Sequence, residues 1–154
     1  MTKKSILILF PDEWLSHSPT VLNMIRGLSE SFHVHTIAID DGLYPNEALP
    51  RNHLTFIRIH RFLSRFFLRK LRPLYSRIKA LLLLRAASAY LDRRHVDEVI
   101  GVDAIGLWVA QKTFGHCHFL SLEVRQDRYF RQARTACIDS ILIQSIDRYR
   151  FLFK

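Results

Sequence analysis

The fold of this chain is decided near its start, by the stretch Ser5-Ile6-Leu7-Ile8-Leu9-Phe10-Pro11-Asp12-Glu13-Trp14-Leu15-Ser16-His17-Ser18-Pro19 and the helix and strand that follow it. Ile6 to Phe10 is an apolar run without alternation, which is typical of a parallel strand buried on both faces. Ser18 is placed to cap a helix that begins at Pro19, where a missing N–H costs nothing. Phe32 to Asp40 is rich in β-branched residues and predicts a second strand. Strand, helix and strand in this order predict a right-handed parallel crossover.

The rest of the chain continues the alternation of strands and helices. The strands expected after the first crossover cover His53–His60, Val96–Val102, His116–Leu122 and Ile138–Gln144. The expected helices are a short basic one over 61–72 that Pro73 ends, one from about Leu74 to Arg94, one over Ala104–Phe114 ended by Gly115, a polar one over Asp127–Ala136 and one from Ser145. In the helix from Leu74, the residues expected to face the core are Leu74, Ile78, Leu81, Leu82 and Ala89. This pattern predicts one α/β domain over residues 1–154. We expect an open doubly wound parallel sheet, Rossmann-like, in three α/β/α layers.

Composition limits the class of protein. The 154 residues are 49% hydrophobic and 24% charged, as expected of a globular domain with a real core. Two cysteines, Cys117 and Cys137, give neither a disulfide framework nor a metal-ligand spacing, so we expect a reduced cytoplasmic protein without a metal. The apolar run after Lys3-Lys4 is too short for a secretory signal, and no stretch is long enough to span a membrane.

The net charge of +9 is concentrated in one segment. Eleven of the 23 basic residues, but only one acid, Asp92, lie between Arg58 and Arg94. Charge runs are usually solvated faces, but here large apolar residues are interleaved with the cations, as in helices that lie on anionic membranes. The basic helical segment 61–94 is therefore predicted to bind an anionic membrane surface, with nucleic acid as the less favoured partner. The residues expected to make this contact are Arg61, Arg65, Phe66, Arg69, Lys70, Arg72, Arg77 and Lys79.

Ligands of an open parallel sheet bind beyond the carboxyl ends of the strands. The residues that follow the predicted strands, and are therefore candidates for a binding site, are His17, Ser18, Asp103, Glu123, Arg125, Gln144 and Ser145, with the whole segment Asp12 to Ser18 at the first strand. Asp103 has the alternative role of capping the helix that it begins, and Glu123 that of a local ion pair with Arg125 or Arg128. The sequence has no G-x-G-x-x-G or Walker lysine loop and no Ser-His-Asp set.

Three stretches carry a resemblance to a known family. They are Ser5 to Asp40 with its turn Glu30-Ser31-Phe32-His33-Val34-His35, Val96-Asp97-Glu98-Val99-Ile100-Gly101-Val102-Asp103, and Cys137-Ile138-Asp139-Ser140-Ile141-Leu142-Ile143-Gln144-Ser145-Ile146-Asp147-Arg148. The last is similar to an A-D-x-V-I-x-x-S-x-x-x-R segment, and Phe119-Leu120-Ser121-Leu122-Glu123 is similar to the family's fifth strand. The chain thus resembles the N-terminal, acceptor-side domain of a GT-B glycosyltransferase of the family 4 type. The family's Gly-Gly pair in the first loop is replaced here by Ser16-His17-Ser18-Pro19, and a frequent histidine by Leu122.

The resemblance implies a function and a missing partner. It implies sugar transfer from a nucleotide-sugar to a lipid-linked or envelope glycan acceptor, in the cytoplasm on the inner face of the membrane, and it adds Arg148 to the acceptor-binding candidates. The donor-binding second domain has no counterpart in these 154 residues. We therefore expect the chain to end early, with no cofactor of its own, and the nucleotide-sugar to be bound by the missing domain or by a separate chain. The alternative is a non-catalytic Rossmann-like module that binds anionic membrane or nucleic acid through its basic helices.

Overall fold

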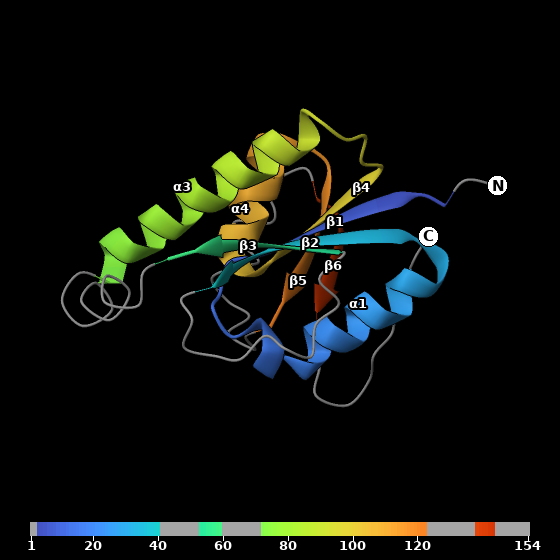
Figure 1. The fold of residues 1–154 in the computed structure, drawn as a ribbon, viewed down its shortest axis with the longest axis horizontal. Helices are drawn as coiled ribbons and strands as arrows, with labels where there is room; N and C mark the ends of the chain where they lie inside the picture. The colour runs from blue at the N-terminus through green and yellow to red at the C-terminus, as the bar shows by residue number, and fades with distance from the viewer. Residues whose placement is uncertain (1–2, 41–52, 60–71, 123–137, 144–154) are drawn as a thin grey trace.

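A computed structural model describes residues 3–40, 53–59, 72–122 and 138–143 of the chain. It confirms the predicted fold class, an open parallel α/β sheet with helices on both faces (Figure 1). Six strands pair in the order β3-β2-β1-β4-β5-β6, and every pairing is parallel. The strands are β1 (Ser5–Phe10), β2 (His33–Asp40), β3 (Leu54–Arg58), β4 (Glu98–Val102), β5 (Cys117–Ser121) and β6 (Ile138–Ile143).

Strand β1 is central because its side chains are apolar on both faces. Ile6, Ile8 and Phe10 contribute to one buried cluster, whereas Leu7 and Leu9 contribute to another on the opposite face. All five side chains are at most 2% exposed. A strand with this composition is stable only between two helical layers, and it lies here between β2 and β4.

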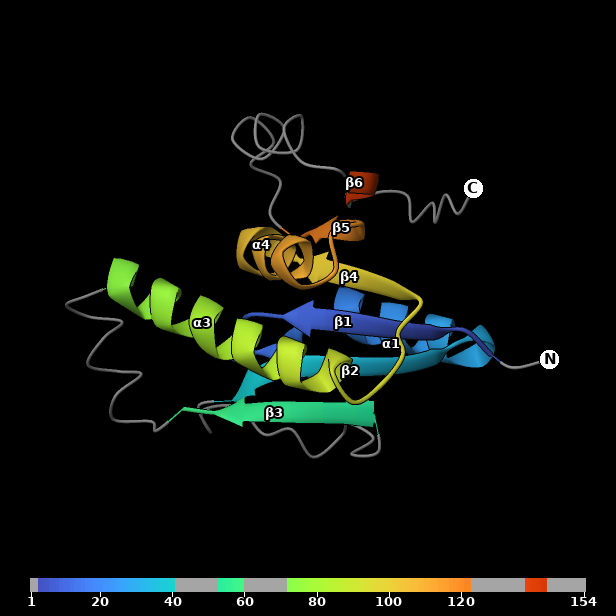
Figure 2. The ribbon, with the colours of Figure 1, turned by 90° about the horizontal axis from the view of Figure 1, so that it is seen from above.

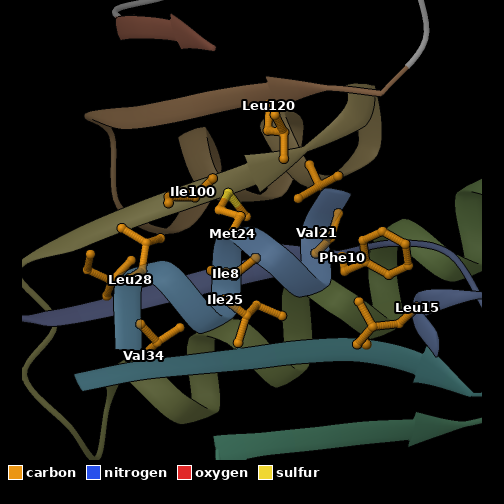
Figure 3. Close-up of a cluster of buried hydrophobic side chains, with 13 residues drawn as sticks. Ile8, Phe10, Leu15, Val21, Met24, Ile25, Leu28, Val34, Ile100 and Leu120 are labelled. Carbon is orange, nitrogen blue, oxygen red and sulfur yellow. The ribbon is translucent and has the colours of Figure 1, made fainter. Parts of the chain in front are cut away.

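The first layer is α1 (Pro19–Ser31), which follows the short helix η1 (Leu15–His17). Val21, Met24, Ile25 and Leu28 repeat at helical spacing and are buried against the sheet (Figure 3). Leu15 of η1 is fully buried in the same cluster. This contact fixes the start of α1 against the carboxyl end of β1.

The second layer is α3 (Arg72–Leu91) and α4 (Asp103–Thr113), which lie side by side on the opposite face of the sheet (Figure 2). Helix α4 approaches the sheet very closely because two glycines face each other. A Cβ atom on Gly101 would lie 2.6 Å from the backbone of Gly106, and one on Gly106 would lie 2.6 Å from the carbonyl oxygen of Leu9. The contact of α4 with β1 and β4 therefore depends on the absence of side chains at both positions.

The prediction for the inward face of α3 is wrong. The structure buries Tyr75, Lys79, Leu83 and Ala87, which are spaced four residues apart along the helix, whereas Leu74, Leu81 and Ala89, three of the residues expected to face the core, are exposed. The helix begins at Arg72, with Pro73 in its first turn. Apolar residues occur on every side of this helix, so their spacing does not single out one face.

His35 of β2 is a partly buried base that we expect to make stability depend on pH. Its ring stacks on Tyr90 of α3 at 4.3 Å between centroids, and its Nε2 lies 2.9 Å from the Thr55 hydroxyl. Burial, together with the charges of Arg94 and His53, lowers the pKa of His35 from 6.5 to about 4. Because the folded state binds the proton less readily than the unfolded state, stability is fully present above pH 6.5 and is lost as the pH falls from 6.5 to about 4.

The check is urea unfolding across that pH range. We expect the free energy of unfolding to fall on acidification, and to fall less in His35→Phe, which keeps the ring stack but cannot be protonated. His33→Gln, at an exposed position of the same strand, is the control and should retain the wild-type slope. A His35 ring that titrates at 6.5 by NMR would contradict the prediction.

Candidate functional site at the carboxyl edge of the sheet

The strand order reverses between β1 and β4, which are neighbours although they are the first and fourth strands. Helix α1 leaves β1 on one face, and α3 and α4 cover the other face (Figures 1 and 2). Open α/β sheets bind their ligands beyond the carboxyl ends of the strands at such a reversal. The register Leu9 opposite Gly101 brings the ends of β1 and β4 level.

A buried charge cluster follows β1 at this edge. The Lys79 ammonium donates a hydrogen bond to Asp12 Oδ1 at 2.9 Å and lies 3.5 Å from Glu13 Oε1. The Tyr75 hydroxyl donates to Glu13 Oε1 at 2.5 Å, and the ammonium lies 5.2 Å from the centre of the Tyr75 ring. The side chains of Lys79 and Glu13 are 9% and 11% exposed, whereas that of Asp12 is 25% exposed. Asp12 is therefore the member of the cluster that is most accessible to a ligand.

The position of Lys79 corrects its predicted role. Lys79 was expected among the membrane-binding cations, but its ammonium is buried on the inner side of its own helix, α3, and is paired with two carboxylates. A buried ammonium without these partners would be costly, and the carboxylates come from a loop 66 and 67 residues earlier in the chain. Arg77, two residues away, is exposed as a membrane contact requires.

Ser18 and His17 lie at the start of α1, beside this cluster in the chain. Ser18 occupies the predicted cap position and is only 3% exposed, but its side chain makes no capping hydrogen bond. Its backbone angles, φ −104° and ψ 85°, differ from the extended conformation that directs a capping oxygen at the helix, so the predicted capping role is wrong. His17 ends η1 and is exposed. The Ser16 hydroxyl oxygen is buried and has no hydrogen-bond partner among the described residues.

Asp103 connects the ends of β4 and β5. Its Oδ1 accepts a hydrogen bond from the backbone N–H of Leu122 at 2.9 Å. This contact gives Asp103 a role at the sheet edge, and the alternative that it also caps its own helix stays a prediction. Asp103 has a φ of 54°, a left-handed conformation that costs a non-glycine residue about 1–2 kcal/mol and that aspartate tolerates better than most. In this conformation the Asp103 carboxylate reaches the backbone that follows β5.

The remaining predicted residues lie outside the described part of the chain. These are the acceptor-binding candidates Glu123, Arg125, Gln144, Ser145 and Arg148 and the membrane-binding candidates Arg61, Arg65, Phe66, Arg69 and Lys70, while only the backbone of Arg72 is described. The sequence interpretation missed the roles of Tyr75 and Lys79. The available signal was the pair of acids that follows β1 and Pro11. A tyrosine and a lysine four residues apart on a helix without acids completed it.

The chemistry of this edge favours a ligand rich in hydroxyl groups. Two carboxylates against one ammonium leave an excess of negative charge, which disfavours a phosphate. Carboxylate oxygens accept hydrogen bonds from hydroxyls, and the buried Ser16 oxygen lies in the same loop. Within the described ranges, no group of three or more His, Cys, Asp or Glu residues is arranged to hold a metal ion.

Two further findings are not specific to this edge. Among the described residues, none of the helices has the length and hydrophobicity needed to cross a membrane. No protein-family model, no curated protein and no solved structure matches this chain.

Proposed function

We propose that this chain is the acceptor-side domain of a GT-B glycosyltransferase of the family 4 type. The observation that carries the proposal is the carboxylate pair of Asp12 and Glu13 at the point of strand-order reversal. In this proposal Asp12 accepts hydrogen bonds from the hydroxyls of a glycan, because it is the more exposed of the two carboxylates. Tyr75 and Lys79 hold the loop in place from α3.

The proposal assigns the reaction's two substrates to different parts of the enzyme. The glycan or lipid-linked acceptor binds at the carboxyl edge described here, and the nucleotide-sugar donor binds in a second domain or in a separate chain. The negative cluster after β1 supports this division, since a nucleotide diphosphate would be repelled by the carboxylates. The acceptor is proposed to be presented at the inner face of the membrane.

A second candidate function is a non-catalytic module that binds an anionic membrane or nucleic acid. The observation that favours it is helix α3, which has no acidic residue over its 20 positions. Transfer or hydrolysis of a nucleotide-sugar by the chain, alone or with a donor-binding partner, would exclude this candidate.

Saccharide binding tests the first proposal. Saturation-transfer NMR with glucose, galactose, mannose and N-acetylglucosamine should detect binding of at least one sugar to the wild-type chain. Asp12→Asn, which removes the charge at constant size, should weaken that binding by about tenfold, the effect of one hydrogen bond to a charged group. Glu30→Gln, on the exposed face of α1, is the matched control and should bind as the wild type does. Equal affinities of Asp12→Asn and wild type would contradict the proposed role of Asp12.

A further inference from the structure

The outward face of α3 combines exposed leucines with exposed arginines. Leu74 and Leu81 are 44% and 60% exposed, and Arg77 and Arg85 are exposed on the same side of the helix. These four residues, at spacings of three and four, follow one stripe along the helix, which we call the α3 outer stripe. The buried stripe of Tyr75, Lys79, Leu83 and Ala87 runs along the other side of the helix.

The charge of the outer stripe is entirely positive. No aspartate or glutamate occurs between Arg72 and Leu91, and Lys79 is neutralised in the buried cluster. Arg77 and Arg85 therefore have no acidic neighbour on their own helix. An exposed face with cations, leucines and no acids complements an anionic surface that also accepts apolar side chains.

The other exposed large hydrophobic residue lies in the same layer. Among the described residues, Leu74, Leu81 and Trp108 are the large hydrophobic side chains that are exposed, and all three belong to α3 or α4. These helices lie side by side (Figure 2). The described residues of α1, on the opposite face of the sheet, include no exposed large hydrophobic residue. A single exposed leucine on a protein surface needs no explanation. Here, however, all the exposed large hydrophobic residues among the described ones lie in the layer of α3 and α4, which indicates a surface with a function.

We propose that the α3 outer stripe lies on an anionic lipid bilayer, with Leu74 and Leu81 inserted among the lipids and Arg77 and Arg85 at the phosphates. A helix with this arrangement lies in the plane of the interface, since α3 is not apolar enough to span the membrane. The bilayer is favoured over nucleic acid because leucines spaced seven residues apart gain nothing from a phosphate backbone. This surface does not depend on the glycosyltransferase assignment.

The same helix connects the bilayer with the charge cluster. Leu74, Arg77 and Leu81 alternate along the helix with Tyr75 and Lys79, which hold Glu13 and Asp12 from the inner side. A bilayer on the outer stripe would therefore lie within one helix diameter of the carboxyl edge. If the proposed function is correct, the acceptor reaches Asp12 directly from the lipid headgroups.

Vesicle sedimentation tests the proposal with the full chain. Phosphatidylglycerol vesicles should pull down the protein, and phosphatidylcholine vesicles should leave most of it in solution. The double variant Arg77→Glu and Arg85→Glu should bind at least about 25-fold more weakly, because each cation contributes about fivefold and the new acids repel the lipid. Leu81→Ser should weaken binding by about tenfold through lost apolar burial.

The matched control is Arg26→Glu, the same charge reversal at an exposed position of α1 on the opposite face, to be compared with Arg77→Glu. Arg77→Glu should weaken binding several-fold more than Arg26→Glu, with circular dichroism confirming that both variants are folded. Equal losses in the two variants, or no binding of the wild type to phosphatidylglycerol, would overturn the proposal. So would a Leu81→Ser variant that binds as tightly as wild type, or an RNA oligonucleotide that prevents vesicle binding while being bound equally by Leu81→Ser. Loss of saccharide binding in Asp12→Asn with vesicle binding intact separates this surface from the acceptor site.

Discussion

Replacement of Lys79 by methionine is expected to lower the free energy of unfolding by about 3–5 kcal/mol, the range for breaking a buried ion pair from one side. The methionine retains the apolar part of the Lys79 side chain on the inner side of α3. The loss of stability therefore arises from the missing ammonium charge. Without the ammonium, the carboxylates of Asp12 and Glu13 remain close together at 25% and 11% side-chain exposure, with the Tyr75 hydroxyl as the remaining described donor to Glu13. Their repulsion and lost solvation act against the folded state.

Urea unfolding followed by circular dichroism measures this effect. Arg77→Met removes a cation from the outer side of the same helix and should change stability by about 0.5 kcal/mol or less. The triple variant Asp12→Asn, Glu13→Gln, Lys79→Met should recover much of the lost stability, since neutral amides no longer require an ammonium. A Lys79→Met variant as stable as Arg77→Met would show that the cluster is not a structural ion pair.

Replacement of Gly106 by alanine is expected to destabilise the fold by about 3 kcal/mol, at the upper end of the usual cost of overpacking. The new Cβ would lie 2.6 Å from the carbonyl oxygen of Leu9 in the central strand, and 3.2 Å from the backbone of Gly101. Neither contact involves a flexible side chain that could move aside. Helix α4 would have to shift away from β1 and β4, and the carboxylate of Asp103 at its start would shift with it.

Gly27→Ala is the matched control. Gly27 lies inside α1, and a Cβ there would meet nothing within 4 Å. Because alanine favours the helix and restricts the unfolded chain, this variant should gain about 0.5–1 kcal/mol. Gly101→Ala should resemble Gly106→Ala, and the two together should cost less than their sum, because both separate the same pair of backbones. Thermal unfolding with Gly106→Ala at wild-type stability would contradict the argument.

Both variants act on the elements that hold the candidate site. Lys79 connects α3 with the loop after β1, and Gly106 brings α4 against the end of β4. Asp103 then joins the ends of β4 and β5 through the Leu122 amide. The carboxyl edge is therefore held by three long-range contacts, each between elements that the sequence predicts separately.

The sequence by itself determined the fold class and the described strands to within a few residues. Apolar runs such as Ile6 to Phe10 are local signals, because a strand buried on both faces needs no partner to be recognised. The crossover through α1 and the turn at Gly115, whose φ is 86°, are equally local. The position of the carboxyl edge also follows from these signals, since parallel strands all end on one side of the sheet.

Only the tertiary structure decided which side of α3 is buried and what Lys79 does. The helix carries apolar residues all around, so its orientation depends on contacts made only in the folded chain. Tyr75 and Lys79 bind Glu13 and Asp12, more than 60 residues earlier. Leu83 and Ala87 pack in the core on the same side. That choice turned Leu74 and Leu81 outward and removed Lys79 from the exposed cations. Ion pairing between distant segments leaves no periodic trace in a sequence, because its energy depends on a distance that exists only after the chain has folded.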